Sequence, residues 1–405
     1  MTYTADALLA EIAETGRDGR RGGYSRHVFD PAERALRDWF IERATAIGLE
    51  VEVDRNANLW AWWGAPGPNA VVTGSHLDSV PGGGAHDGPL GVVSALTAVS
   101  ALRAAGASPR HPIAIIVFAE EEGARFGVAC LGSRLLTGSI TAERAAELRD
   151  AEDRAFGDVA RDAGFGAIGR DDDALDRIGV FIELHVEQGK ALIDLDAPVA
   201  LASSILEHGR WRISVHGQGN HAGTTAIRDR HDPVLPAAAA VLAARSAAVA
   251  RTGGRATIGR LEPVPGGTNV IASRVSAWLD VRAESAADTR AIVADVADAV
   301  AAAAAAEGCT SSVVEESYSA EVRFDPDLRD QLAAALRDDS TGRPIPVLAT
   351  GAGHDAGVLA AVVPTAMLFV RNPSGISHAP DECADPEAIE AGVTALMTAL
   401  LTLAS

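Results

Sequence analysis

The alternation of apolar and polar positions divides the first half of the chain into strands and helices. Apolar residues recur at helical spacing over residues 30–48 and again over 89–106, and each run ends in glycine. Residues 49–64 alternate as a strand pair does, and short apolar runs at 69–78 and 111–123 predict buried strands. Strands that alternate with helices in this way favour an α/β layer structure.

The pattern changes near residue 209. Strands are expected at 209–219, 256–264, 273–284 and 311–322, and alanine-rich helices at about 236–250 and 287–306. The order strand, helix, two strands, helix, strand predicts a split α+β unit with a four-stranded antiparallel sheet and two helices. Because the apolar run at 365–372 resumes the α/β pattern, we expect residues 1–208 and 322–405 to form one domain and 209–321 an inserted one.

Length and charge narrow the class of protein. A chain of 405 residues is too long for one ordinary core, so more than one domain is expected. The content of 47% hydrophobic and 22% charged residues is typical of a globular protein. The net charge of −20 argues against a nucleic-acid partner, because phosphate binding needs a positive field.

The sequence gives no sign of a membrane or of a disulfide framework. It lacks a run of about 18 apolar residues and a basic-then-apolar leader, so we expect neither a membrane span nor a signal peptide. The three cysteines, Cys130, Cys309 and Cys383, are scattered and lack the spacing of a metal site. Free thiols in a reduced, cytoplasmic enzyme are the expected outcome.

The stretch "SHLDSVPGGGAHDGPLG" at 75–91 carries the first candidate chemistry. His76 follows a predicted strand, and Asp87 follows a triple-glycine loop that can fold back beside it. A loop at the carboxyl end of a strand is where α/β proteins bind their ligands, and glycine permits the irregular backbone that converging ligands need. Taken alone, such residues are more often ordinary surface residues.

A run of three carboxylates ends the next predicted strand. Glu120, Glu121 and Glu122 repel one another where the chain leaves the core, and a bound cation would relieve that repulsion. One carboxylate could bind the metal while a neighbour stays free as a general base. A solvated acidic turn is the competing interpretation of this motif alone.

Two further histidines follow predicted strands: His185 in "FIELHVEQGK" and His378 in "FVRNPSGISHAPDE". Four strand-end motifs that each carry a histidine or a glutamate are hard to explain as independent surface features. Their ligands are oxygen and imidazole without thiolate, which suits Zn, Mn, Co or Ni and disfavours a cysteine-type structural zinc.

Ordered motifs along nearly the whole chain resemble the hydantoinase/carbamoylase family of binuclear metal amidohydrolases, within the aminoacylase-like metallopeptidase clan. The motifs are "GSHLDSVP", "DGPLGV", "EEGARF", "LHVEQG", "NHAGTT", "NVI" with "LDVR", "GAGHDA" and "GISHAPDE". The resemblance implies an α/β catalytic domain interrupted by a smaller dimerisation or lid domain. It also implies a homodimer, a small carboxylate substrate and two divalent metal ions per subunit, Zn or Mn, with Co or Ni as further options.

The resemblance also implies roles for residues of the catalytic domain. His76 and His185 would bind one metal, and Asp87 would bridge to a second metal that Glu122 and His378 complete. Glu121 would be the general base, and Asp78 would orient the imidazole of His76.

Other residues would contact the substrate. His221 in "NHAGTT" would stabilise the oxyanion, and Asn269 and Arg282 would bind the substrate carboxylate, for which arginine offers a two-pronged match. The further contacts implied are Gln188 and the backbone of Gly351, Ala352 and Gly353. For His354 and Asp355, support of that loop is at least as expected as contact with the substrate.

The favoured activity is hydrolysis of a ureido or carbamoyl C–N bond, with allantoate as the preferred substrate because "WAWWG", "EEGARFGVACLGSRLL" and "LFVRNPSGISH" resemble allantoate amidohydrolases. An N-carbamoyl-L-amino acid, or an N-formyl or other N-acyl amino acid, is the alternative. A non-catalytic binding protein is disfavoured because Glu121 and all five ligand positions are present. A peptidase is disfavoured because no lysine follows "DGPLGV". His86 departs from the family, which usually has phenylalanine before the bridging aspartate.

Overall fold

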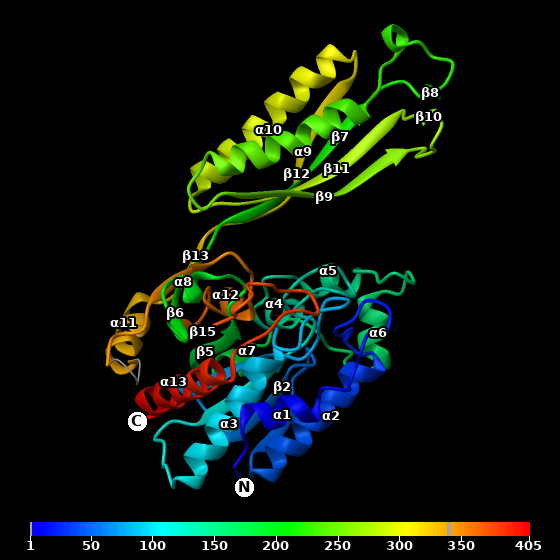
Figure 1. Ribbon diagram of the computed structural model, residues 1–405. Helices are drawn as coiled ribbons and strands as arrows, with labels where there is room; N and C mark the ends of the chain where they lie inside the picture. The colour runs from blue at the N-terminus through cyan, green and yellow to red at the C-terminus, as the bar shows by residue number, and fades with distance from the viewer. Residues whose placement is uncertain (1, 338–341) are drawn as a thin grey trace. The chain divides into compact units, whose positions relative to one another are not determined.

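The chain forms two compact units. A computed structural model describes residues 2–337 and 342–405 (Figure 1). The first unit comprises Met1–Ser204 and Arg323–Ser405, and the second comprises Ile205–Val322. The chain therefore leaves the first unit once, completes the second, and returns.

The first unit contains most of the elements. Its strands are β1 (Glu50–Val53), β2 (Leu59–Trp63), β3 (Ala70–His76), β4 (Ile113–Phe118), β5 (Ile178–Val186), β6 (Val199–Ile205), β13 (Val322–Arg323), β14 (Val347–Thr350) and β15 (Thr365–Val370). Its helices are α1 (Ala5–Glu11), α2 (Pro31–Ala46), α3 (Pro89–Ala104), α4 (Leu131–Thr137), α5 (Ala142–Ala146), α6 (Phe156–Asp162), α7 (Asp172–Leu175), α8 (Ala191–Asp194), α11 (Pro326–Ala335), α12 (Asp355–Leu359) and α13 (Pro386–Ala404).

All nine strands belong to one mixed sheet, with the order β1-β2-β4-β3-β5-β15-β6-β13 and β14 beside β6. The four central strands β4, β3, β5 and β15 run parallel, whereas β1, β2 and β6 pair antiparallel with their neighbours. Every residue of β3, β4 and β15 is buried, as expected for parallel strands covered on both faces. The carboxyl ends of the four parallel strands therefore meet at one edge of the sheet.

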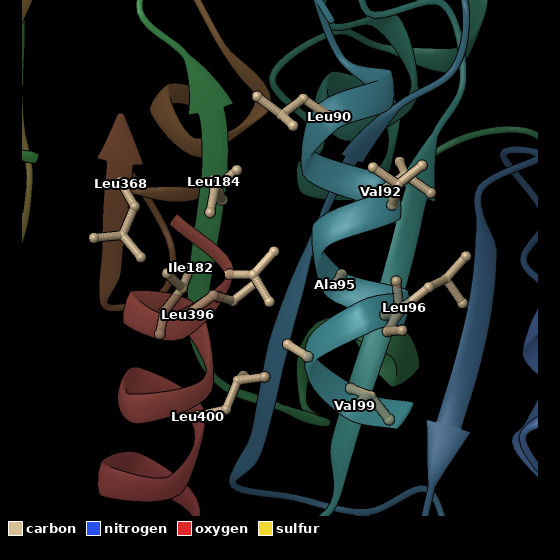
Figure 2. Close-up of a cluster of buried hydrophobic side chains, with 14 of the residues drawn as sticks. Leu90, Val92, Ala95, Leu96, Val99, Ile182, Leu184, Leu368, Leu396 and Leu400 are labelled. Atoms are coloured by element: carbon tan, nitrogen blue, oxygen red, sulfur yellow. The ribbon is translucent and has the colours of Figure 1, made fainter. Parts of the chain in front are cut away.

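The main hydrophobic core lies between the sheet and the helices α3 and α13. Figure 2 shows side chains of α3, β5, β15 and α13 directed at one another; the labelled residues are Leu90, Val92, Ala95, Leu96, Val99, Ile182, Leu184, Leu368, Leu396 and Leu400. Burial of each such leucine stabilises the fold by roughly 1.5–3 kcal/mol. This layer holds one face of the sheet rigidly beneath the loops at its edge.

The opposite face of the sheet carries polar side chains near its carboxyl edge. Successive residues of a strand point to opposite faces, so Glu183 and His185 face away from the core that contains Leu184. Helix α12 packs on this face, and its Ala356 N–H donates to Glu183 Oε2 at 2.9 Å. Buried apolar side chains such as Phe118 and Phe181 cover the rest of this face, so the polar groups are confined to its carboxyl edge.

The second unit is an antiparallel sheet covered by two helices. Its strands are β7 (His208–His216), β9 (Arg255–Val264), β11 (Arg274–Arg282) and β12 (Thr310–Ser319), in the order β12-β7-β11-β9. Helices α9 (Val234–Val249) and α10 (Ala286–Ala306) pack together and against the sheet. A short pair, β8 (Asn220–His221) and β10 (Val270–Ile271), and a 3-10 turn at Ile227–Asp229 complete it.

Most of the expected elements are confirmed. The strand pair at 49–64, the helices at 30–48 and 89–106 and the strand–helix order of the second unit all occur. The short helices between residues 131 and 175 and the β8–β10 pair were not expected, because segments of two to seven residues leave no clear periodicity. The three cysteines are free thiols.

Helix α13 is long and apolar enough to cross a membrane by length and composition alone. Half of its apolar window is buried inside the first unit, where it packs on α3 and β15. Core helices of globular proteins meet the same criterion, so this helix is explained by its packing.

Candidate metal centre

The four parallel strands bring the four sequence motifs to one edge. His76 is the last residue of β3, and His185 is the last but one of β5. The glutamates at 120–122 follow β4, and His378 follows β15. Because His76 pairs with Phe118 and His185 with Phe369 in register, these motifs start at the same level of the sheet.

The rings of His76 and His185 each leave one nitrogen available. His76 Nδ1 lies 3.1 Å from the carbonyl oxygen of Asp78, and His185 Nδ1 lies 2.9 Å from that of Val186. A carbonyl oxygen accepts only, so Nδ1 carries a hydrogen in both rings. The Nε2 atoms are buried and have no hydrogen-bond partner. Two imidazole lone pairs therefore point into the same space.

Asp87 lies between His76 and His185 on one side and His378 on the other, and its two oxygens face opposite sides. Its Oδ1 is 3.2 Å from His185 Nε2 and 3.7 Å from His76 Nε2. Its Oδ2 is 3.2 Å from His378 Nε2, which is 3.4 Å from Glu122 Oε2. The carboxylate of Asp87 thus faces two separate sets of ligand atoms.

These distances fit bound metal ions. Two ligand atoms bound to one ion at about 2.0–2.2 Å lie roughly 3–4 Å apart. One candidate set comprises His76, Asp87 and His185, and a second comprises Asp87, Glu122 and His378. The unpartnered Nε2 atoms and the buried carboxylates make a divalent cation the natural occupant, because a buried charge without a partner is costly.

The electrostatics of the site also favour a positive charge. Burial opposes protonation of His76, but the carboxylates of Glu121, Asp78 and Asp87 raise its pKa well above the usual range. Burial likewise opposes ionisation of Asp87, yet the imidazoles of His185, His378 and His76 hold its pKa well below the usual range. The site is therefore built to pair carboxylates with cations, either protons on the rings or metal ions.

Asp78 positions the adjacent carboxylates. Its Oδ1 accepts the backbone N–H of Glu121 and its Oδ2 that of Glu122, both at 3.1 Å. Burial is the main cause of a raised pKa at both glutamates, to about 7 for Glu122 and well above the usual range for Glu121. The carbonyl of Asp78, and not its carboxylate 3.6 Å away, accepts from His76 Nδ1, so Asp78 orients the imidazole through its backbone and the main chain of the two glutamates through its side chain.

The carboxylate of Glu121 is held at one oxygen and open at the other. Its Oε1 accepts the thiol of Cys130 at 3.2 Å, and its Oε2 lies 3.6 Å from His76 Nε2. Both side chains are buried, at 5% exposure for Glu121 and 3% for Cys130. The free oxygen therefore faces the ligand set.

Glu120 has a structural role instead. Its Oε1 accepts the backbone N–H groups of Arg125 and Phe126 at 2.9 and 2.8 Å, which closes the loop after β4. Its φ of 54° lies in the left-handed region, so the turn directs its side chain away from those of its two neighbours. Of the three consecutive glutamates, Glu120 therefore stabilises the loop, and Glu121 and Glu122 lie at the site.

A second polar layer lies behind His185. The ring of His354 lies 4.4 Å from that of His185, and Glu183, His185 and His354 form a third group of possible metal ligands. Glu183 is already bonded to Ser75 and Ala356, and Asp355 accepts the hydroxyl of Ser133 at 2.5 Å. His354 and Asp355 are 3% and 0% exposed, so they lie inside the protein, directly after the loop of residues 351–353.

Gln188 and the loop of Gly351–Gly353 lie in the first unit with the ligands. Gln188 Nε2 donates to Asp87 Oδ2 at 2.8 Å, whereas its Oε1 is buried without a partner. Ala352 N–H donates to Thr350 Oγ1 at 3.1 Å, and Gly353 is exposed. The structure therefore gives Gln188 a contact with a candidate ligand that the sequence did not indicate.

His221, Asn269 and Arg282 lie in the second unit. The carbonyl of Asn269 accepts the N–H of Ala222, and His221 pairs with Val270, so the first two share one small strand pair. His221 Nδ1 accepts the N–H of Gly223 at 3.0 Å, which leaves the ring hydrogen on the exposed Nε2. Arg282 Nε donates to Asp280 Oδ1 at 3.1 Å, which orients the guanidinium.

Sequence reasoning missed Glu382, Ser377 and Cys130 as members of the site. Ser377 Oγ lies 3.2 Å from Asp87 Oδ2, and Glu382 Oε1 accepts the N–H of Asp87 at 2.9 Å. Glu382 stands in the quoted motif "GISHAPDE", which was the available signal. Cys130 had no signal, because its position beside Glu121 depends on the fold of the loop between them.

Comparison with known proteins identifies the family of this chain. The sequence profile of Peptidase family M20/M25/M40 matches residues 72–402. An N-carbamoyl-L-amino acid amidohydrolase of Geobacillus stearothermophilus is 33% identical and aligns over 98% of this chain and 97% of its own. An allantoate amidohydrolase of Bacillus subtilis (strain 168) is 31% identical over 89% of this chain and 88% of its own.

A solved structure shares the fold. The crystal structure of an amidase of the hydantoinase/carbamoylase family from Burkholderia vietnamiensis superimposes with a TM-score of 0.87 and 31% identity, and the match covers 100% of this chain and 98% of that one. The resemblance inferred from the ordered motifs is thereby confirmed. The chain belongs to Peptidase family M20/M25/M40, within its hydantoinase/carbamoylase branch of amidohydrolases.

Proposed function

We propose that this amidohydrolase cleaves a ureido or carbamoyl C–N bond in a small carboxylate substrate, with allantoate as the preferred substrate. One observation carries the proposal. The buried Asp87 faces two sets of ligand atoms, beside a carboxylate, that of Glu121, with a free oxygen. Such a site suits hydrolysis of unreactive C–N bonds, and the similarity to carbamoyl and allantoate amidohydrolases supports the bond type.

Two divalent ions per subunit are proposed, Zn or Mn, with Co or Ni as further options. His76 and His185 would hold the first, Glu122 and His378 the second, and Asp87 both. When bound, such ions supply a nucleophile at neutral pH and polarise the scissile carbonyl. The ligand atoms of imidazole and carboxylate match the preferences of these metals.

Glu121 would move the protons of the reaction. Its Oε2 faces the ligand set and is placed to take a proton from the attacking water and to deliver it to the departing nitrogen. The thiol of Cys130 occupies the other oxygen, and Asp78 fixes the backbone N–H of Glu121. Burial keeps competing water from this carboxylate.

Residues of the second unit would bind the substrate. The N–H of His221 Nε2 is available to stabilise an oxyanion, because Nδ1 is occupied as an acceptor. Arg282, oriented by Asp280, and Asn269 would bind the substrate carboxylate. Gln188 and the backbone of Gly351–Gly353 would supply further contacts.

Hydrolysis of an N-carbamoyl-L-amino acid is the second candidate. The similarity to the Geobacillus stearothermophilus enzyme extends over 98% of this chain, a longer match than the 89% for the Bacillus subtilis allantoate amidohydrolase. Both substrates combine a carboxylate with a carbamoyl nitrogen, so the same ligands and base would serve either.

An activity assay distinguishes the allantoate candidate from the N-carbamoyl-L-amino acid candidate. The protein is first dialysed and reloaded with Mn or Zn. Ammonia release is measured with allantoate and with N-carbamoyl L-amino acids, and release of the free amino acid is measured with N-carbamoyl, N-formyl and N-acetyl L-amino acids. A kcat/KM for allantoate above that for every amino-acid derivative supports the first candidate, and the reverse order supports the second. Failure with the whole panel would refute the proposed bond type.

Substitution of the shared carboxylate tests the metal proposal. Asp87→Ala is expected to lose both ions and to abolish turnover, because Asp87 faces both ligand sets. Metal per subunit is measured by mass spectrometry after gel filtration. Asp194→Ala, at an exposed position of α8, is the control and should keep both ions. Retention of both ions by Asp87→Ala would contradict a bridging role.

The base is tested by an isosteric change. Glu121→Gln is expected to keep its metal and to lower kcat by about 10²–10⁴-fold, the usual contribution of a general base. Steady-state kinetics and metal content are measured together, with Glu143→Gln on the exposed surface of α5 as the control. A fully active Glu121→Gln enzyme would show that another group moves the proton.

We also propose a homodimer formed through the second unit. Leu235, Leu242 and Val249 of α9 recur every seven residues and are 52%, 70% and 78% exposed. Residues at this spacing lie along one side of a helix, and such a stripe of large apolar side chains favours a protein partner. The neighbouring strand β9 ends the sheet, so its outer edge is available for pairing with a second copy.

Charge on this stripe should separate the subunits. The double variant Leu242→Asp, Val249→Asp is expected to elute as a monomer, because aspartate at an apolar interface loses its hydration. Light scattering after size exclusion gives the mass. Val314→Asp, also exposed but on β12 at the far edge of the sheet, should remain dimeric. A double variant with the mass of a dimer would place the interface elsewhere.

A further inference from the structure

Glu382 holds the loop that carries Asp87. The side chain is 4% exposed, and its Oε1 accepts the backbone N–H groups of His86 and Asp87 at 3.0 and 2.9 Å. Glu382 and Asp87 are 295 residues apart in the sequence. The loop has no helix or strand of its own between β3 and α3, so these bonds replace the missing regular structure.

The second oxygen of Glu382 reaches the side chain of Asp87 through one hydroxyl. Ser377 Oγ lies 3.0 Å from Glu382 Oε2 and 3.2 Å from Asp87 Oδ2. A hydroxyl has one hydrogen to donate, so Ser377 bonds one of these two oxygens at a time. Glu382 is therefore linked to Asp87 directly at its main chain and, at its carboxylate, by sharing this hydroxyl.

The glycine-rich sequence of the loop follows from this contact. A Cβ on Gly84 would lie 2.3 Å from Glu382 Oε1, well inside contact distance. The loop backbone thus packs directly on the carboxylate. A larger residue at position 84 would displace either the loop or Glu382.

The position of Glu382, and not its charge, serves the loop. A single oxygen holds two N–H groups of the loop that carries Asp87. An uncharged amide oxygen at the same place would accept the same two N–H groups, so loss of the charge alone should leave the loop in place.

We infer that Glu382 is a positioning residue for the proposed two-metal centre: it fixes the main chain of Asp87 so that the two carboxylate oxygens face the two sets of ligand atoms. Oδ1 is directed at His185 and Oδ2 at His378, each at 3.2 Å. A rotation of this carboxylate would lose one of the two sets. The inference deepens the proposed function and relies on it for the presence of two ions.

Three substitutions separate position from charge. Glu382→Gln keeps an oxygen for the two N–H groups and removes the charge. Glu382→Asp keeps the charge but is one methylene shorter and cannot reach both N–H groups. Glu382→Ala removes both features, and Glu390→Ala, exposed on α13, is the matched control.

Binding of Mn²⁺ is measured by equilibrium dialysis of the metal-free proteins, and circular dichroism checks that each variant is folded. We expect Glu382→Gln to bind two ions within about threefold of wild-type affinity, and Glu382→Asp and Glu382→Ala to lose about 10–100-fold, as for other groups that orient metal ligands. If Glu382→Ala does not fold, the contrast between the Gln and Asp variants remains.

Wild-type Mn²⁺ affinity in Glu382→Asp would overturn the inference, and together with a loss in Glu382→Gln it would assign the effect to charge. Equal losses in the Gln and Asp variants would also overturn it, because the Gln variant keeps the oxygen that accepts the two N–H groups. These measurements contain no substrate. A wild-type protein that binds two ions but hydrolyses nothing in the substrate panel would therefore refute the proposed function and leave the positioning role intact.

Discussion

The parallel alignment of β4, β3, β5 and β15 is the constraint on which the site depends. The carboxyl ends of parallel strands lie at one edge of the sheet. Side chains from four segments that are far apart in the sequence therefore meet there. The apolar layer of α3 and α13 holds the sheet from one face, and the polar groups gather at the carboxyl edge of the other face. A single antiparallel exchange among these strands would send one motif to the opposite edge.

Concentrated negative charge is the cost of this arrangement. Asp78, Asp87, Glu121 and Glu183 are all at most 5% exposed, and burial opposes the ionised form of the last three. The structure offsets part of the cost with backbone N–H groups, as at Asp78, and part with imidazoles, as at Asp87. Among the atoms left without a partner are the buried Nε2 atoms of His76 and His185, which lie beside these carboxylates and form part of the candidate metal site.

The sequence predicted most helices and strands of the scaffold, because the local spacing of apolar residues determines them. The central strands, α3 and the strand–helix order of the second unit follow from the spacing of apolar residues alone. The candidate ligands were visible because each follows such a strand. The contacts of Glu382 and Cys130 were not visible, since neither periodicity nor spacing relates them to Asp87 and Glu121. The pairing of Gln188 with Asp87 likewise depends on a side-chain rotamer that only the packed structure determines.

The origin of the ligands along the chain bears on how the protein is made. The candidate centre draws on β3 near the beginning and on the loop after β15 near the end, with the whole second unit synthesised in between. A nascent chain on the ribosome carries His76 and Asp87 long before His378 and Glu382 emerge. Full assembly of this site must therefore follow synthesis of the second unit and of β15, and a translation product that stops within the second unit would lack two of the candidate ligand-bearing segments.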